Sequence, residues 1–400
     1  MIARSRWAGL AVIVPALVSC ASKPLQPPID TPDGGPRCLA QQEVGRSVDL
    51  LFLIDDSASM ALLQQNLARN FPLFMQALES APGGLPDVHI AVASTDMGAQ
   101  ADGASASAIA ACDGTGKAGA FQYSPRGSCA ATNLDAGATF ISNVGGVANY
   151  TGNLADTFAC IAALGEGGCG FEQPFAAITR ALGADGQPPP AQNQGFLRDD
   201  AYLGIVLITN EDDCSAAPGS HLFDTDSNVT LTSELGPPSS FRCNEFGHLC
   251  DGAPPARNAP NNSTGDTVTY QSCVSSEQSG RLKTVAETAA QIKSLKPDPA
   301  NQIAFAAIAA PAAPYTVRWR NRPIDGGTGL WPEISHSCTT PDGSFGDPSV
   351  RVTELVRQFG AHGLAASICD SEFASALQLI GQQMVALIDG GPGAPDDGCP

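Results

Sequence analysis

Three oxygen-bearing side chains follow one apolar run near the start of the chain. In VDLLFLIDDSASM, the apolar stretch 48–54 ends at Asp55, and Ser57 and Ser59 occupy the next alternate positions. Alternate residues of an extended segment point the same way, so the three oxygen atoms can converge on one point. Hard divalent cations such as Mg²⁺ take oxygen ligands in octahedral geometry and keep several waters. The spacing therefore predicts a divalent-metal site at the end of a buried strand.

Such a site would be poor in negative charge. One carboxylate and two hydroxyls leave a bound cation electrophilic toward an incoming acidic group. The helix expected to start near Met60 adds partial positive charge, which also favours an anionic ligand. The alternative interpretation is a plain strand-to-helix turn, in which Ser57 or Ser59 only caps the helix.

At these residues the chain resembles the von Willebrand factor A domain, a family in which Asp-x-Ser-x-Ser directly follows the first strand. In strand and helix order the resemblance extends over residues 47–389. It implies a metal-ion-dependent adhesion site, in which Asp55, Ser57 and Ser59 hold Mg²⁺ or Mn²⁺, or alternatively Ca²⁺. A further coordination position would take a Glu or Asp of a protein or matrix partner. In the family, a Thr from a second loop and an Asp from a third loop complete the site.

The chain departs from the family in both of those loops. The segment 208–213, ITNEDD, carries Asn210 where the family has Asp, and Asp212 or Asp213 could supply the missing charge. In the second loop, GGCGFEQP offers Glu172 as its only strong oxygen ligand. Glu172 could restore the charge lost at Asn210, or it could instead complement the dipole of the helix that it precedes.

Apolar segments alternate with amphipathic ones between the two ends of the chain. Strands are expected at five places: 48–54, 88–93, 203–208, 303–309 and 363–368. The segment LGIVLI at 203–208 is apolar on both faces, as a central parallel strand covered by helices should be. The alternation predicts an α/β fold with a doubly wound, mostly parallel sheet flanked by helices, of the von Willebrand factor A or Rossmann-like kind.

Apolar residues at helical spacing predict the flanking helices. One stripe covers 63–78, where Pro72 should kink or split the helix. Two more stripes cover 175–182 and 282–292. The last stripe covers 373–387, and Asp370 or Ser371 is expected to cap its start.

Three long polar inserts interrupt this pattern, at about 97–150, 214–280 and 311–348, and they hold most of the cysteines. Loops this long inside a compact domain are usually functional or disordered, and the cysteines favour ordered, disulfide-pinned loops here. The chain has 13 cysteines, and an even number remains when Cys20 is set aside. In an oxidising compartment they should form disulfides that pin the inserts. Spacing does not settle connectivity, and the simplest expectation pairs near neighbours: Cys112–Cys129, Cys160–Cys169 and Cys243–Cys250.

The start of the chain is typical of an exported lipoprotein. Two arginines precede an apolar stretch, 7–17, that is too short to span a bilayer. Leu-Val-Ser-Cys, ending at Cys20, resembles the lipobox of bacterial lipoproteins, in which the cysteine is lipidated and becomes the mature N-terminus. The resemblance implies a signal peptide over residues 1–19. An ordinary secretory signal is the alternative.

The residue after the lipobox and the flanking segments indicate where the domain would reside. Ala21 rather than an aspartate follows the cysteine, which in lipoproteins favours the outer membrane. Residues 20–46 are rich in Pro and Gly and should act as a tether, and residues 390–400 form a similar tail. The domain at 47–389 is therefore expected in the periplasm or on the cell surface, in contact with the membrane through its lipid alone.

Composition argues against several classes of function. The formal net charge is -19, from 21 basic and 40 acidic residues, without a cluster of Lys and Arg, so nucleic acid is not an expected partner. The motifs of zinc proteases, serine hydrolases and phosphate-binding loops do not occur, so no enzymatic activity is expected. A hydrolase built on an unrecognised set of residues stays as a remote alternative.

Two further stretches resemble metal sites only weakly. The run from Asp224 to Thr230, DTDSNVT, begins like a calcium-binding EF loop, but Val229 stands where the turn needs Gly. Cys243, His248 and Cys250 suggest zinc, but no fourth ligand is spaced nearby, and an exported chain favours disulfides.

Together these features predict a lipid-anchored envelope protein that binds a protein or matrix ligand through a divalent cation. A second hypothesis, from a different class, is an envelope scaffold whose metal site has degenerated, with Asn210 as the trace of that loss. Divalent cations should raise the melting temperature under the first hypothesis and leave it unchanged under the second.

Overall fold

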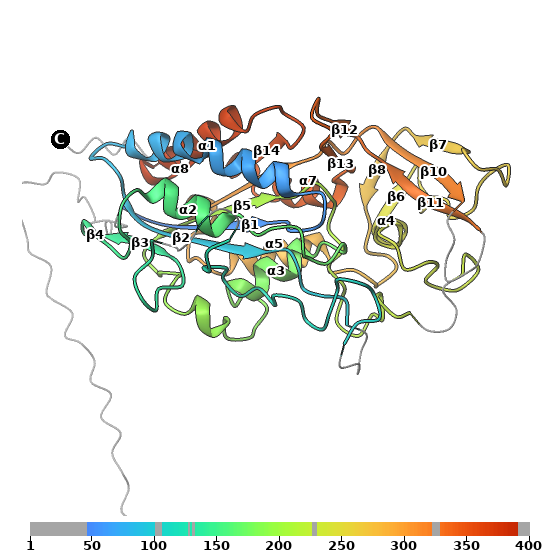
Figure 1. The fold of residues 1–400 in the computed structure, drawn as a ribbon, viewed down its shortest axis with the longest axis horizontal. Helices are drawn as coiled ribbons and strands as arrows, with labels where there is room; N and C mark the ends of the chain where they lie inside the picture. The colour runs from blue at the N-terminus through green and yellow to red at the C-terminus, as the bar shows by residue number, and fades with distance from the viewer. Residues whose placement is uncertain are drawn as a thin grey trace, which may run out of the picture. The chain divides into compact units, whose positions relative to one another are not determined.

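Five parallel strands make up most of one mixed sheet (Figure 1). They are β1 Ser47–Ile54, β2 Asp87–Ser94, β5 Tyr202–Ile208, β9 Ile303–Ala309 and β14 Gly363–Ser367. Two short antiparallel strands, β3 Ile141–Val144 and β4 Val147–Ala148, complete one edge. The strand order is β14-β9-β5-β1-β2-β3-β4.

The computed structural model describes residues 46–100, 106–126, 129, 133–225, 230–321 and 329–390. These residues belong to one compact unit, Glu43–Asp396. The expected signal peptide, the lipidation site Cys20, the tether up to residue 45 and the tail from residue 391 lie outside the described residues, as do residues 226–229 of the calcium-like loop. In the described part of the chain, no helix is both long and apolar enough to cross a membrane.

Each apolar run expected to form a strand does so. The register pairs Val48 of β1 with Tyr202 of β5, and every residue from Leu203 to Ile208 is buried. Helices cover both faces of the sheet, which explains why this strand is apolar throughout. The predicted α/β class, with a mostly parallel sheet flanked by helices, is confirmed. At the amino-terminal edge of the sheet, the Tyr202 hydroxyl donates to the backbone carbonyl of Ile388 at 3.4 Å.

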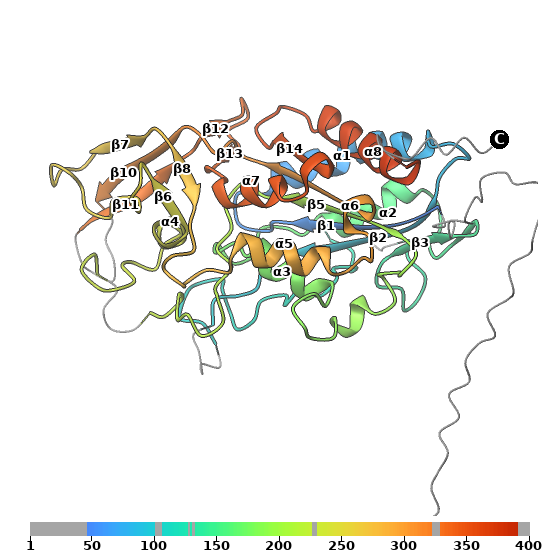
Figure 2. The ribbon, with the colours of Figure 1, turned by 180° about the vertical axis from the view of Figure 1, so that it is seen from behind.

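Two layers of helices enclose the sheet, and each layer has its own apolar core. The first layer consists of α1 Ala61–Glu79, α2 Leu154–Ala162 and α8 Ala374–Ile388. The second consists of α3 Pro174–Ala181, α5 Val285–Lys293 and α7 Val350–Arg357. Figures 1 and 2 show α1 and α8 on one face of the sheet and α3 and α5 on the other. Short helical turns also occur, namely η1 Ala191–Asn193, α6 Pro299–Gln302 and η2 Gly360–His362.

Two details of the helices differ from expectation. Helix α1 runs through Pro72 without being split; the residue is exposed, and the buried stripe continues on both sides of it. Neither Asp370 nor Ser371 caps α8. Instead, Asn66 of α1 accepts a hydrogen bond from the Phe373 backbone N–H at 3.3 Å. The first turn of α8 is thus completed by a helix more than 300 positions earlier in the chain, which spacing alone does not indicate.

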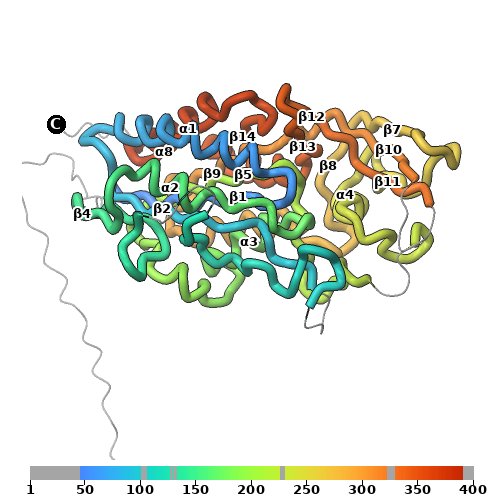
Figure 3. Tube along the Cα trace, in the orientation of Figure 1, coloured from blue at the N-terminus to red at the C-terminus, as the bar shows by residue number. Residues whose placement is uncertain are grey.

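The second and third inserts fold together beside the carboxyl ends of the central strands. They contribute α4 Phe241–Gly247, β6 His248–Cys250, β7 Thr267–Tyr270, β8 Cys273–Ser275, β10 Tyr315–Asn321 and β11 Leu330–Ser335. Strands β7, β10 and β11 form a small antiparallel sheet, shown at the far end of the tube in Figure 3. This small sheet has an apolar core of its own, to which β10 contributes Tyr315, Val317 and Trp319. A last hairpin, β12 Cys338–Thr339 and β13 Phe345–Gly346, leads back to α7.

Disulfides pin the inserts, as expected, but not between nearest neighbours. The described bonds are Cys112–Cys169, Cys129–Cys160, Cys214–Cys243, Cys250–Cys273 and Cys338–Cys369. The expected local pairs were therefore wrong in each case. Three of these bonds join an insert to another part of the chain, and Cys214–Cys243 and Cys250–Cys273 each join two parts of the insert 214–280. Tertiary proximity rather than sequence proximity decides the pairing.

Candidate functional site

The order of the strands places the candidate motif at a divergence point of the sheet. Strand β2 lies on one side of β1, whereas β5, β9 and β14 follow on the other side. In open α/β sheets, ligands bind outside the carboxyl ends of strands at such a point. Asp55 follows β1 there, and its backbone N–H donates to the carbonyl of Ile208, the last residue of β5, at 2.9 Å.

The Asp55 carboxylate is buried and fixed in orientation. The backbone N–H of Ser57 donates to Oδ1 at 2.8 Å, and the hydroxyl of Thr209 donates to Oδ2 at 2.9 Å. Burial raises the pKa of Asp55 to about 6, although the hydrogen bonds from Ser57 and Thr209 act in the opposite direction. Holding the ionised form in this position therefore has an energetic cost that a bound cation would remove.

Three buried oxygen atoms around this carboxylate have no hydrogen-bond donor among the described residues. They are Ser57 Oγ, Asn210 Oδ1 and Glu172 Oε1. The residues are 4%, 0% and 1% exposed, respectively. Native proteins satisfy most buried polar atoms, and an unmet one needs an explanation, such as a bound ion. All three belong to residues that the sequence singled out as oxygen ligands, and this donor set fits a hard divalent cation.

The amide of Asn210 is turned so that its oxygen stays free. Its Nδ2 donates to Ser59 Oγ at 2.9 Å and to the Phe345 carbonyl at 3.1 Å. An amide nitrogen carries two hydrogens, so both are used and Oδ1 is left as the only open acceptor. The structure thus joins Ser59 to Asn210 by a direct contact.

Glu172 comes from the loop before α3 and lies within electrostatic range of Asp55. Its Oε2 accepts a hydrogen bond from the Thr95 hydroxyl at the end of β2. Burial raises the pKa of Glu172 well above its ordinary value, and the negative charges of Asp55 and Glu211 add to the shift. The carboxyl groups of Asp55 and Glu172 are therefore close enough for their negative charges to repel each other.

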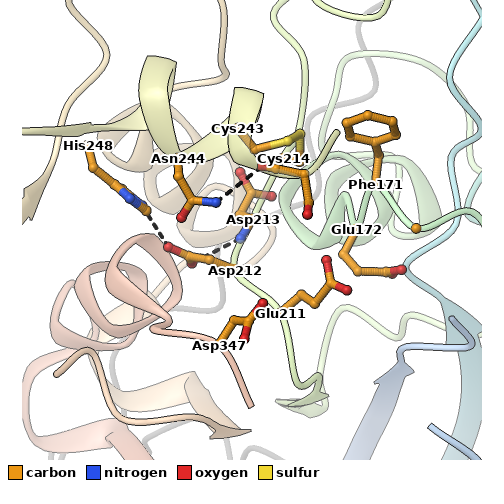
Figure 4. Close-up of a pocket in the computed structure, with 12 residues that line it drawn as sticks. Phe171, Glu172, Glu211, Asp212, Asp213, Cys214, Cys243, Asn244, His248 and Asp347 are labelled. Carbon is orange, nitrogen blue, oxygen red and sulfur yellow. Dashed lines mark hydrogen bonds and ion pairs between the residues drawn. A yellow bond between two sulfur atoms is a disulfide. The ribbon is translucent and has the colours of Figure 1, made fainter. Parts of the chain in front are cut away.

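A second group of carboxylates borders the site. Burial also raises the pKa of Glu211 well above its usual range, with Asp347 and Asp55 contributing. Figure 4 shows the Glu211 side chain between Glu172 and Asp347, at a cavity of about 20 Å³. This volume suffices for about one water molecule. Glu211 was not singled out from the sequence, although it stands next to Asn210 in the same acidic run.

Asp56, the second aspartate of the motif, is neutralised by a residue of the first insert. Lys117 Nζ lies 2.6 Å from Asp56 Oδ2 and 2.9 Å from Asp96 Oδ2. The Ser94 hydroxyl donates to Asp56 Oδ1 at 2.6 Å. Asp56 is thus compensated within the protein, whereas its neighbour Asp55 is not paired with Lys117. Nothing in the spacing of the chain indicates Lys117, because it lies in a polar loop.

Asp212, a candidate ligand from the sequence, has its carboxylate occupied by hydrogen bonds from His248 and from the start of α7. Its Oδ2 accepts hydrogen bonds from His248 Nε2 and the Arg351 backbone N–H, each at 2.9 Å, and Oδ1 accepts one from the Val352 N–H at 3.0 Å. Burial alone would raise the pKa of Asp212, but His248 and these amides outweigh it and lower the pKa. Asp212 thus holds the start of α7.

Asp213, the other residue considered as a replacement for the missing charge, is paired elsewhere. Its Oδ2 lies 3.2 Å from Arg351 Nη2, and both side chains are fully buried. The zinc alternative is also excluded by covalent structure. Cys243 is bonded to Cys214, and Cys250 is bonded to Cys273.

Among the described residues, no group of three or more His, Cys, Asp and Glu side chains is arranged to hold a metal ion. The candidate set is of another kind, since it combines the carboxylates of Asp55 and Glu172 with hydroxyl and amide oxygens. The chain matches no protein-family model, and no curated protein is detectably similar to it.

Proposed function

We propose that the protein is an exported envelope lipoprotein that binds a protein or matrix ligand through a divalent cation at the carboxyl ends of β1 and β5. Asp55, Ser57, Ser59, Glu172 and Asn210 would hold the ion. The observation that carries the proposal is the presence of unmet, buried oxygen atoms on Ser57, Glu172 and Asn210 beside the Asp55 carboxylate. Their chemistry suits Mg²⁺ or Mn²⁺, with Ca²⁺ as a further candidate.

The charge of the donor set supports this proposal. Asp55 and Glu172 supply two negative charges, which balance a divalent ion, and Asn210 supplies a neutral oxygen. In the family that the motif resembles, an Asp in the third loop would give the second charge. Here Glu172 takes over that charge from a different loop.

Access to the site is also compatible with binding of a partner. Ala58, between the two serines, is exposed, and Ser59 is partly exposed. Gly170, on the loop that carries Glu172, is exposed as well. When bound, the cation would supply an electrophilic position for a carboxylate of the partner, and these residues would leave room for it.

Cation binding can be tested with Mn²⁺ alone. Native protein is expected to bind Mn²⁺ in calorimetry and to melt at a higher temperature with it than in EDTA. Asp55→Ala should weaken Mn²⁺ binding by roughly 10- to 100-fold or more, because it removes a charged part of the site. It should still unfold cooperatively in EDTA. Glu79→Gln is the matched control, since this exposed carboxylate lies at the far end of α1.

The same experiment separates the two hypotheses. If native protein shows neither Mn²⁺ binding nor stabilisation by Mg²⁺, Mn²⁺ or Ca²⁺, the cation mechanism is wrong. The envelope scaffold with a metal-free site would then be the remaining function. If Asp55→Ala binds Mn²⁺ as native protein does, the ion is held elsewhere.

A further inference from the structure

The β12–β13 hairpin lies against the carboxyl ends of the outer parallel strands. A Cβ atom at Gly346 would lie 2.5 Å from Ala310 Cβ and 3.0 Å from Ile368 Cγ2, so the hairpin backbone is in direct contact with the residues that follow β9 and β14. The Cys338–Cys369 disulfide joins the first strand of the hairpin to the loop after β14. Contact and covalent bond thus hold the hairpin at the same edge of the sheet as the candidate site.

This hairpin binds Asn210 from two sides. The Phe345 carbonyl accepts a hydrogen bond from Asn210 Nδ2 at 3.1 Å, and the Asp347 backbone N–H donates to the Asn210 carbonyl at 2.8 Å. The Phe345 ring stacks on His336, with centroids 3.8 Å apart, and His336 Nδ1 lies 2.6 Å from Asp347 Oδ1. The backbone and the amide of Asn210 are therefore both oriented by the hairpin.

The contact with Phe345 also explains why residue 210 is an asparagine. An aspartate would place a carboxylate oxygen against the Phe345 carbonyl, and two acceptors cannot share a hydrogen bond. Asparagine donates to that carbonyl and keeps Oδ1 for another partner. The Asn210 amide therefore suits a position beside the Phe345 carbonyl of the hairpin. In the described hydrogen bonds, no other residue of the candidate site contacts the hairpin.

We propose that the β12–β13 hairpin, held by the Cys338–Cys369 disulfide, is a positioning element that sets the cation affinity of the site through Asn210. This inference rests on the proposed function, because it concerns the same ion. Release of the hairpin would free the Asn210 amide to rotate, and Oδ1 would no longer be held in place as a ligand. Groups that orient metal ligands typically change metal affinity by about 10- to 100-fold when removed.

The test compares two disulfide deletions of equal loop length in the full chain. Cys338→Ser with Cys369→Ser releases the hairpin, and Cys129→Ser with Cys160→Ser is the control; each bond closes a separation of 31 residues. Equal loops should give a similar loss of stability in EDTA in the chain-entropy model. Removal of the Cys338–Cys369 bond should weaken Mn²⁺ binding by roughly tenfold, and removal of the Cys129–Cys160 bond should change it by less than about twofold.

A second variant leaves every disulfide intact. Gly346→Ala adds a Cβ atom that meets Ala310 and displaces the hairpin. Gly346→Ala should also weaken Mn²⁺ binding. It replaces the Cys338→Ser, Cys369→Ser variant in the test if that variant does not fold. Asn210→Ala should weaken Mn²⁺ binding in native protein but have little additional effect once the hairpin is released, because coupled residues are not additive.

The outcomes distinguish this inference from the function on which it rests. If native protein does not bind Mn²⁺, the proposed function fails, and the inference fails with it. If native protein binds Mn²⁺ and the variant without the Cys338–Cys369 bond binds it equally well, the proposed cation site is retained and the positioning role is wrong. Equal weakening in both disulfide deletions would also overturn the positioning role, because general loosening would then account for it.

Discussion

At the scale of single residues, the candidate site brings together acidic groups that form no ion pair among the residues that the structure describes. Burial raises the pKa values of Asp55, Glu172 and Glu211. The charge of Asp55 adds to the shift of both glutamates, and the charge of Glu211 adds to that of Glu172. By contrast, Asp56, the residue next to Asp55, is compensated by the ammonium group of Lys117. Of these two adjacent aspartates, Asp56 has a positive partner, whereas Asp55 has none among the described residues.

The raised pKa values predict how stability depends on pH. In EDTA, the native state binds protons more tightly at Asp55 and Glu172 than the unfolded chain does. Their stabilising contribution is complete below the unfolded pKa values and is lost as pH rises from about 4 toward 7. The shift of Asp55 alone, from 3.8 to about 6, corresponds to about 3 kcal/mol of unfolding free energy.

Chemical denaturation across that pH range measures this effect. Glu172→Gln should give a shallower decline, because the neutral amide cannot ionise. Saturating Mn²⁺ should abolish or reverse the decline, because the ion favours the charged carboxylates. A metal-free protein whose stability is independent of pH in this window would show that these groups ionise freely.

Lys117 gives a second prediction at this scale. Lys117→Met leaves Asp56 as a buried carboxylate without a cation, and breaking a buried ion pair is strongly destabilising. Because Lys117 retains 24% side-chain exposure, a loss of about 2–3 kcal/mol in unfolding free energy is expected. Lys117→Arg should retain most of the stability. A change below about 0.5 kcal/mol would mean that water already compensates Asp56.

Some residues of the site can be predicted from the local sequence, and others cannot. Asp55, Ser57 and Ser59 are contiguous, so one short segment after an apolar strand suffices to propose them. Glu172 could be proposed because a single strong oxygen ligand occurs in its loop. The two hydrogen bonds from Asn210 and the ion pair of Lys117 connect loops that are far apart in the chain, and no local pattern encodes such contacts.

At the scale of elements, apolar periodicity was sufficient for the five parallel strands and for most of the helices. Burial on both faces makes the central strands recognisable from composition alone. The spacing does not predict helices α2 and α7, which border polar inserts. The disulfide pairs could not be predicted either, since they depend on how the inserts pack.

Asp212 illustrates an element that is held by a residue from elsewhere. The first turn of α7 has its backbone N–H groups at Arg351 and Val352 satisfied by the Asp212 carboxylate. Asp212→Ala should therefore lower the unfolding free energy by about 2 kcal/mol, and Mn²⁺ affinity should stay within about twofold of native. Weaker Mn²⁺ binding with unchanged stability would instead identify Asp212 as a ligand.

At the scale of the whole molecule, the proposed lipid anchor has a direct test. The full precursor made in a bacterial host should partition into the detergent phase of a phase-separating nonionic detergent. Cys20→Ala should move it to the aqueous phase, because the acyl chains that bury their methylene groups are then absent. Native protein in the aqueous phase would favour the ordinary secretory signal.

The hydrogen bond between Tyr202 and Ile388 has a consequence for orientation. It shows that the start of β1 and the end of α8 share the amino-terminal edge of the sheet. Asp55 lies beyond the opposite edge, about 23 Å further along at the usual rise of a strand. The chain that precedes β1 therefore joins the sheet at the edge opposite Asp55. A partner that reaches the candidate site would approach the domain from the side away from that junction.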